Sequence, residues 1–341
     1  MSYLQAIVIA IVQGFTELFP VSSLGHSVLV PAWIGGSWQT LVTQSAAAKS
    51  ESSFYLAFIV ALHVGTALAL LWFFRADWIR IIAGFLRSAR RGLSERAFSV
   101  RDSDERLAWM IIFTTIPVGI TGLALEHTFR TLLAKPLGAA IFLFINGLIL
   151  LAGERARRRA EAAGASPGGA LRQPAPVAGG SPEADDARGA ALRVSSRGSR
   201  SVDELAEAYA SDVRIAGLSY RDGMYIGLLQ VSALLAGISR AGVTMVGGLW
   251  RGLDHEDAAR FAFLLATPVI LAAGVLKLPT LFGPAGEHIH GQAAVGFVLT
   301  GVCAYISVRF LVRYFRTRTL TPFAVYCLLA GGASIIRFGV L

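Results

Sequence analysis

Long apolar stretches alternate with short polar connections along most of the chain. A helix needs about 20 apolar residues to cross the hydrocarbon core of a bilayer, and six stretches approach that length. They are Phe54–Phe74, Leu107–Glu126, Leu137–Gly153, Phe261–Leu278, Ala293–Leu311 and Leu320–Leu341. The pattern predicts an all-α polytopic membrane protein with six transmembrane helices.

Two further apolar segments differ because polar and helix-breaking residues interrupt them near the middle. Tyr3–Ile34 contains Pro, Gly, Ser and ionisable residues at its centre, and Met224–Trp250 contains Gly, Ser and Arg there. Such interruptions at membrane depth are tolerated only where the backbone is buried in protein or lines a wet cavity. We predict that each segment is a re-entrant helix–loop–helix hairpin.

The composition agrees with a membrane protein and excludes other classes. Of the 341 residues, 54% are hydrophobic and only 16% are charged, whereas a soluble domain carries about 25% charged residues. The formal net charge of +9 comes almost entirely from Arg. In a membrane protein such charge collects at the cytoplasmic ends of helices, so no nucleic-acid partner is predicted.

Residues 154–214 lose the hydrophobic periodicity of the rest of the chain. Ala, Gly, Ser, Pro and Arg dominate this segment, as they do in disordered linkers. Only a short stretch around Leu205–Tyr209 keeps a helical pattern. We predict a disordered cytoplasmic linker here, between a first membrane repeat, residues 1–153, and a second, residues 215–341.

Arginine-rich connections orient the two repeats. The segment Arg75–Arg106 carries eight Arg, and the start of the linker carries four between Arg155 and Arg159. The loop before Leu320 carries three more. Because positive loops face the cytoplasm, the first hairpin is predicted to enter from the outer face and the second from the inner face.

A single offset of 217 positions relates the centres of the two hairpins. The pairs are Gln13 with Gln230, Ser22 with Ser239, Gly25 with Gly242, and Ser27 with Thr244. Each half therefore consists of one hairpin and three spans, in opposite orientation. Inverted repeats with broken helices place their binding site where the breaks meet, near the bilayer midplane.

The first hairpin concentrates groups that can do chemistry. Gln13 and Glu17 are four residues apart and share a helical face, and Ser22, Ser23 and His26 follow within ten residues. A carboxylate at this depth costs at least roughly 2.5–3.5 kcal/mol, which calls for a functional or pairing explanation. Two explanations stay open: a catalytic site, or a carboxylate that pairs with an Arg beside serines that only cap a helix.

The second hairpin carries groups suited to an anion. Arg240 offers a permanent, planar set of five donors that matches phosphate oxygens. Gly237 and Gly242 let the backbone approach a ligand closely, and the amides that open the following helix add partial positive charge. Arg240 could also simply neutralise Glu17, or do so with a ligand or metal between them.

Both hairpins resemble the signatures of one family. Val12–His26 resembles the first signature of the undecaprenyl-pyrophosphate phosphatases of the bacitracin-resistance type, Glu/Gln-x-x-x-Glu followed by Pro-Val-Ser-Ser-x-Gly-His. Gly237–Thr244 resembles the second, Pro-Gly-x-Ser-Arg-Ser-Gly-x-Thr. Leu62–Thr66 and Phe261–Pro268 are also similar to family segments.

The resemblance implies an enzyme that hydrolyses undecaprenyl pyrophosphate to undecaprenyl phosphate and inorganic phosphate, which recycles the lipid carrier of cell-wall synthesis. It also implies a bacterial plasma membrane, an active site that faces outward, and a divalent metal, Mg²⁺ or Ca²⁺. The implied catalytic residues are Glu17, Ser23, His26 and Arg240, and the implied metal ligands are Glu17 and Gln13. The implied substrate-binding residues are Gln13, Ser22, Gly237, Ser239, Gly242 and Thr244.

Three positions depart from the family pattern. Gln13 has an amide where many members have a carboxylate, and Ala236 and Ala241 replace a Pro and a Ser. One fewer negative charge weakens the expected hold on a metal. His63, in the middle of a span, is a weaker candidate that could line the site or be an ordinary buried histidine.

A second class of function stays open on the inverted repeat alone. A transporter or flippase for an anionic polyprenyl lipid would need the binding groups but no acid/base partner. The cluster of Glu17, Ser23 and His26 therefore favours the enzyme. The oligomeric state, including a homodimer, is not determined by these patterns.

Overall fold

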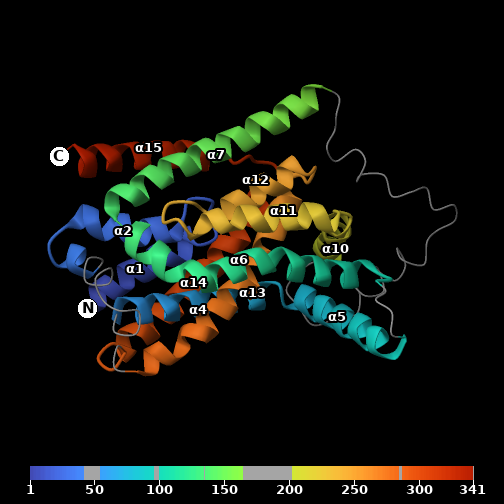
Figure 1. Ribbon diagram of the computed structural model, residues 1–341, viewed down its shortest axis with the longest axis horizontal. Helices are drawn as coiled ribbons and strands as arrows, with labels where there is room; N and C mark the ends of the chain where they lie inside the picture. The colour runs from blue at the N-terminus through green and yellow to red at the C-terminus, as the bar shows by residue number, and fades with distance from the viewer. Residues whose placement is uncertain (42–53, 96–99, 134, 164–201, 284–285, 341) are drawn as a thin grey trace.

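The computed structural model describes residues 1–41, 54–95, 100–133, 135–163, 202–283 and 286–340 (Figure 1). These residues form helices joined by turns, and no strand occurs among them. The predicted all-α class is confirmed. The central part of the predicted linker, residues 164–201, and Leu341 at the end of the last predicted span lie outside the described residues.

Within the described residues, five helices are long and apolar enough to cross a bilayer. They are α6 (Ser103–Leu133), α7 (Pro136–Ala162), α13 (His255–Phe282), α14 (His290–Tyr314) and α15 (Thr321–Gly339). A sixth candidate is α4 (Phe54–Phe73), which bends by 85° into α5 (Arg75–Glu95). Each predicted span falls in one of these helices, so the protein is a multi-pass membrane protein.

The two interrupted segments form pairs of short helices. The first pair is α1 (Tyr3–Thr16) and α2 (Ser23–Ile34). The second is α11 (Tyr220–Val231) and α12 (Arg240–Trp250), with the 3₁₀ turn η2 (Ser232–Leu234) between them. At 1.5 Å per residue these helices span only about 17–21 Å each, less than the roughly 30 Å of a bilayer core. The breaks were predicted correctly, while entry from opposite leaflets stays a prediction.

Each hairpin packs on a helix of the other half. Helix α1 lies on α14, where a Cβ added to Gly14 would lie 2.8 Å from the carbonyl oxygen of Thr300. Helix α11 lies on α6, where a Cβ added to Gly227 would lie 2.3 Å from the carbonyl oxygen of Thr114. Such backbone approach is typical of helix packing in membranes. The two halves are therefore interlocked, and α7 and α15 pair beside them.

Helices α7 and α10 (Val202–Ala216) extend into the predicted linker from both ends, through Ala162 and from Val202. The short helical pattern predicted around Leu205–Tyr209 is part of α10. Sequence periodicity missed the rest of α10 because its buried face mixes polar and apolar residues: Ser211 and Asp212 are each only 1% exposed, beside buried Ile215 and Ala216.

Ion pairs dock α10 against the membrane helices. Arg260 of α13, 6% exposed, donates to both oxygens of Asp212 at 2.7 and 2.9 Å and contacts Asp77 of α5 at 2.9 Å. Arg80 of α5 also reaches Asp212, at 2.5 Å, and Asp77, at 3.1 Å. Because each charge has an opposite partner, the cluster can be held out of water.

Asp212→Asn should lower the free energy of unfolding by about 3 kcal/mol, because the buried Arg260 loses one of its two carboxylate partners. The matched control is Glu161→Gln, which removes an exposed partner of Arg157 on α7 and should cost less than about 1 kcal/mol. Thermal unfolding in detergent would measure both. Equal stability of the two variants would contradict the structural role of the cluster.

Candidate active site

The two helix breaks have the same local construction. Ser22 caps α2 by accepting from the Gly25 amide at 3.2 Å, and Ser239 caps α12 by accepting from the Gly242 amide at 3.1 Å. Serine is a favoured N-cap because its oxygen satisfies a helix-end amide. These are two of the pairs that the offset of 217 relates, so the two breaks share their local construction, while the inverted repeat as a whole stays a prediction.

The residues that open the two helices differ in chemistry. Ser23 is the first residue of α2 and Arg240 is the first residue of α12, again 217 positions apart. The hydroxyl of Ser27 donates to the carbonyl of Ser23 at 3.0 Å, and that of Thr244 donates to the carbonyl of Arg240 at 2.8 Å. The repeat therefore places a hydroxyl and a guanidinium at equivalent positions.

The two breaks touch each other. The Ser22 hydroxyl accepts from the amide of Gly237 at 3.2 Å, and the Ser239 hydroxyl donates to the carbonyl of Phe19 at 3.4 Å. A Cβ added to Gly25 would lie 2.9 Å from the Cα of Gly237, so the backbones are in contact. Gly237 has φ +116° and Ser22 has φ +68°, a region that costs a non-glycine residue about 1–3 kcal/mol.

Asn146 of α7 joins the two breaks and was not found from the sequence. Its amide nitrogen donates to the carbonyl of Pro20 at 3.0 Å, and its oxygen accepts from the amide of Ser239 at 2.9 Å. The side chain is fully buried. A polar residue in a predicted membrane span was the available signal.

Glu17 is the centre of the contacts between the halves. One carboxylate oxygen contacts the Arg240 guanidinium, and the other accepts from the Ser23 hydroxyl and, at 2.8 Å, from the Gln13 amide. The Glu17 side chain is 5% exposed and that of Arg240 is 17% exposed. The structure thus brings together four of the predicted site residues, and it joins the carboxylate of one repeat to the guanidinium of the other.

A histidine does lie at this carboxylate, and it is His63 of α4. Its Nε2 is 3.6 Å from a Glu17 oxygen and 3.5 Å from the Gln13 amide nitrogen. Its Nδ1 lies 2.8 Å from the carbonyl of Ile59 and therefore carries a hydrogen, because a carbonyl only accepts. His63 was only a weaker candidate in the sequence, although it stands in the family-like segment Leu62–Thr66.

His26 points elsewhere. Its Nδ1 lies 2.7 Å from the carbonyl of Ser22, and its Nε2 lies 2.7 Å from the hydroxyl of Tyr326 in α15. In the part of the chain that the structure describes, His26 makes no hydrogen bond or ion pair with Glu17, Ser23 or Arg240. The predicted acid/base role of His26 stays a prediction, without support from these contacts.

The remaining predicted substrate ligands build the breaks. The polar groups of Ser22, Ser239, Gly242 and Thr244 are engaged in the caps and cross-contacts described above, and Gly237 supplies the close approach between the turns. Direct contact of these residues with a substrate stays a prediction.

The site offers one carboxylate, that of Glu17, to a divalent metal. No group of three or more His, Cys, Asp or Glu side chains suited to a metal occurs among the described residues. Gln13 turns its amide nitrogen, which cannot ligate a metal, toward Glu17. Mg²⁺ is commonly held by one or two carboxylates together with substrate phosphates. The residues therefore fit a metal that binds with a phosphorylated substrate better than one held by protein alone.

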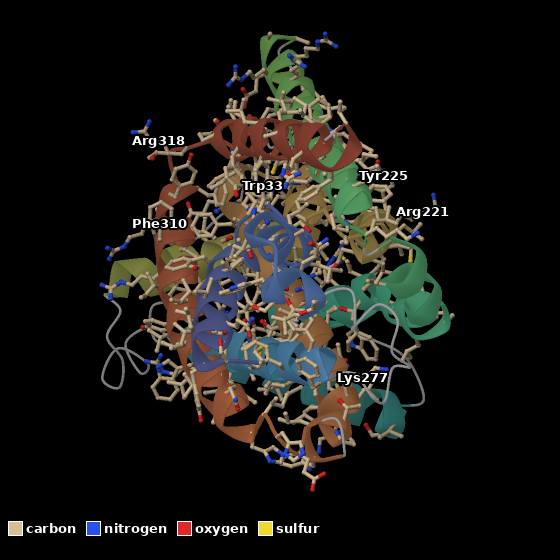
Figure 2. All side chains as sticks on the ribbon, turned by 90° about the vertical axis from the view of Figure 1, so that its left-hand side faces the viewer. Trp33, Arg221, Tyr225, Lys277, Phe310 and Arg318 are labelled. Atoms are coloured by element: carbon tan, nitrogen blue, oxygen red, sulfur yellow. The ribbon has the colours of Figure 1, made fainter. Side chains whose placement is uncertain are left out.

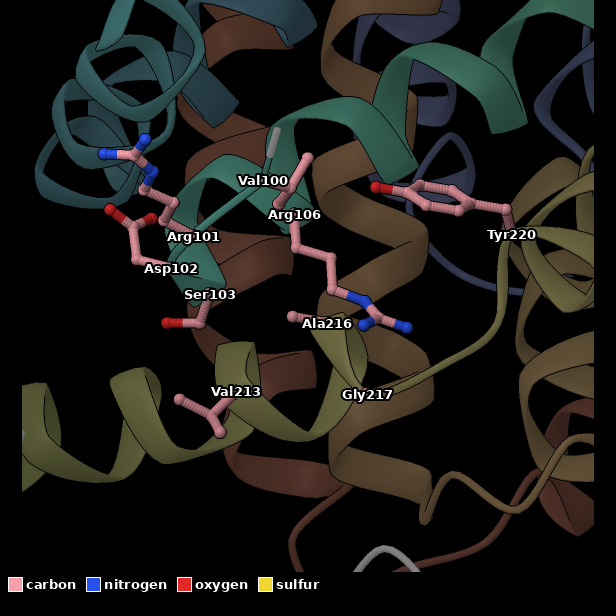
Figure 3. A pocket seen from close by; sticks show the side chains of 9 residues that line it. All are labelled: Val100, Arg101, Asp102, Ser103, Arg106, Val213, Ala216, Gly217 and Tyr220. Atoms are coloured by element: carbon pink, nitrogen blue, oxygen red, sulfur yellow. The ribbon is translucent and has the colours of Figure 1, made fainter. Parts of the chain in front are cut away.

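A separate cavity of about 460 Å³ lies between the start of α6 and the junction of α10 with α11 (Figure 3). Arg106 and Tyr220 line it, and Arg106 donates to the carbonyl of Leu218 at 3.1 Å. That contact satisfies a carbonyl just beyond the end of α10. None of the residues at the two helix breaks lines this cavity, so it is not part of the candidate site.

The fold and the site define a multi-pass membrane protein with a charged site at the junction of two broken helices. The family model of bacitracin resistance protein BacA matches residues 6–172 and 188–333. The chain is 56% identical to undecaprenyl-diphosphatase 2 of Frankia alni, over 100% of this chain and 99% of the relative. It is 53% identical to undecaprenyl-diphosphatase of Mycolicibacterium paratuberculosis, over 98% and 97%. The chain therefore belongs to the BacA bacitracin-resistance family.

Gly25→Ala should separate the two breaks, because the added methyl group meets the Gly237 backbone. We expect kcat to fall by about 100-fold, the cost of a displacement of roughly 1 Å at a reacting group. Gly119→Ala in α6 is the control, since a Cβ there meets nothing within 4 Å. Steady-state kinetics of both variants would test this, and a Gly25→Ala enzyme as active as the control would contradict it.

Proposed function

We propose that the chain is a membrane phosphatase that hydrolyses undecaprenyl pyrophosphate to undecaprenyl phosphate and inorganic phosphate. Family membership and the names of relatives that match the full length of the chain support this activity. The single observation that carries the chemistry is the contact of Arg240 and Ser23 with Glu17 across the two repeats. The site thus offers a cation for phosphate beside a hydroxyl and a base.

Ser23 is the proposed nucleophile. Its hydroxyl already donates to Glu17, so the carboxylate is placed to take the proton as Oγ attacks the terminal phosphorus. The Oγ–P bond forms, the anhydride P–O bond breaks, and undecaprenyl phosphate leaves. Water then attacks the phosphoserine, releases inorganic phosphate and restores the Ser23 hydroxyl.

Arg240 is proposed to bind the phosphoryl oxygens. Splitting a pyrophosphate requires charge on these oxygens to be neutralised, and positioned cations do most of this work. Glu17 holds the guanidinium before substrate binds, and the same carboxylate holds the Ser23 hydroxyl, so the cation and the hydroxyl are kept at one place. A divalent metal, Mg²⁺ or Ca²⁺, with Glu17 as its protein ligand and the Gln13 oxygen as a second after rotation of the amide, would supply further positive charge.

The site is proposed to face the outer side of a bacterial plasma membrane. The basis is the placement of positive charge: α5 begins with Arg75 and is rich in Arg, and the basic end of α7 runs through Arg159. Positive segments stay in the cytoplasm. The bilayer holds the polyprenyl chain of the substrate while its pyrophosphate enters the site.

Arg240→Ala should lower kcat/KM by at least about 1,000-fold, because the transition-state charge loses its main protein partner. The measurement is phosphate release from undecaprenyl pyrophosphate by purified protein with Mg²⁺. Arg251→Ala, at the other end of α12 and paired with Asp222 on the surface, should stay within about threefold of the wild type, as expected of a surface pair.

Phosphate release that survives in Arg240→Ala and Glu17→Gln alike would overturn these roles. If well-folded wild-type protein releases no phosphate at all, the proposed enzymatic activity is overturned, and a transporter of an anionic lipid is favoured.

Gln13→Glu should keep the enzyme active and tighten metal binding, because it adds a second carboxylate of the kind that Mg²⁺ prefers. Mn²⁺ binding followed by electron paramagnetic resonance, with and without pyrophosphate, measures the metal independently of turnover. An unchanged Mn²⁺ affinity in both conditions would contradict metal binding at Glu17.

A further inference from the structure

His26 contacts the backbone of the first helix break rather than the groups at Glu17. The carbonyl of Ser22 accepts from both the backbone amide of His26, at 3.1 Å, and its Nδ1, at 2.7 Å. Ser22 is the only non-glycine residue with positive φ among the described residues. Two hydrogen bonds from one residue thus hold the carbonyl of the strained position. His26 is buried, with 6% of the residue exposed, so this contact is shielded from water.

The Ser22 carbonyl determines which imidazole nitrogen carries the hydrogen, and Tyr326 contacts the other nitrogen. Nδ1 faces a carbonyl and must donate, which leaves Nε2 of the neutral ring as an acceptor. The Tyr326 hydroxyl lies 2.7 Å from Nε2 and can donate to it. The two rings are also stacked, with centroids 5.7 Å apart and planes at 12°.

Helix α15 holds α2 at a second point along the same seam. The indole nitrogen of Trp33 donates to the Ser334 hydroxyl at 2.9 Å, and the Trp33 ring packs edge-on against Phe338. Figure 2 shows Trp33 close to α15, the red helix that crosses above α2. His26 and Trp33 are seven residues apart, which is two helical turns. Side chains of α15 therefore fix both the start and the end of α2.

We propose that His26 and Tyr326 are positioning residues of the phosphatase, and that His26 does not exchange a proton with substrate or Ser23. The Nδ1–H of His26 holds the Ser22 carbonyl so that Ser22 retains its left-handed backbone, and the Tyr326 hydroxyl, which donates to Nε2, holds the imidazole in place. In that conformation the Ser22 hydroxyl meets the Gly237 amide, and Ser23, the next residue, faces Glu17. This inference rests on the proposed function in one respect, because its kinetic effects are measured on the phosphatase reaction.

Asparagine separates this role from acid/base catalysis. The amide of Asn at position 26 can replace the Nδ1–H donor but cannot transfer a proton near neutral pH. His26→Asn should retain kcat within about tenfold of wild type with an unchanged KM, whereas His26→Ala should lose about 100-fold, the cost of a misplaced reacting group. The pH–rate profile of His26→Asn should keep the limbs of the wild-type profile. A proton-transfer role predicts a loss of about 10²–10⁴-fold in both variants.

Tyr326→Phe tests the second partner. It should lower kcat by about threefold to tenfold in wild type, the range for one lost hydrogen bond, and have no further effect in His26→Asn, which lacks Nε2. Tyr314→Phe is the control, because the Tyr314 hydroxyl donates to the Thr319 carbonyl at 3.3 Å, away from α2. An equal effect of Tyr326→Phe in both backgrounds would overturn its action through His26.

Thermal unfolding gives an answer that does not depend on turnover. His26→Ala should lower Tm, and His26→Asn should restore most of it. Suppose that the wild-type enzyme is active and that His26→Asn has the Tm of the wild type but is as inactive as His26→Ala. That result would overturn the positioning role and leave the proposed function intact. If wild-type protein releases no phosphate, the proposed function is overturned instead. In that case the positioning role is judged by stability alone, and a Tm of His26→Ala equal to that of wild type would overturn it as well.

Discussion

The contact between Glu17 and Arg240 is the constraint on which the rest of the structure depends. A carboxylate and a guanidinium lose much of their hydration at this depth, and removal of either one would leave an uncompensated buried charge. Glu17 and Arg240 are 223 residues apart in sequence, so the pair can form only when both breaks are folded and docked. The same requirement explains why each hairpin packs on a helix of the opposite half.

The breaks themselves need partners for their free backbone groups. A helix that stops inside a membrane exposes amides and carbonyls, which must be satisfied by protein. Ser22 and Ser239 satisfy the amides, and Asn146 bridges the carbonyl of one turn and the amide of the other. This bonding lets two irregular turns meet with backbones in contact at Gly25 and Gly237. These contacts fix the two turns relative to each other, and so they also fix the positions of Glu17 and Arg240.

The sequence predicted the parts of this arrangement that depend on local pattern. Apolar length predicted the spans, and the polar interruptions predicted both breaks and the meeting of Glu17 with Arg240. It named His63 only as a weaker candidate and did not find Asn146 or Tyr326, because each comes from a regular helix whose apolar pattern does not show which neighbour the residue faces. The docking of α10 was also missed, since its buried face includes the carboxylate of Asp212, which is stable there only when Arg260 and Arg80 pair with it from other helices.

The two breaks are alike in their local construction and different in their chemistry. Ser23 and Arg240 occupy equivalent first positions of α2 and α12, and both side chains reach the same carboxylate. Two serines at these positions would leave Glu17 without a counter-charge, and two arginines would leave no hydroxyl to attack phosphorus. The structure thus provides two similar helix starts that face each other. Their differences, Ser23 against Arg240 and Glu17 against Leu234, give a site with a hydroxyl on one side, a cation on the other and a carboxylate between them.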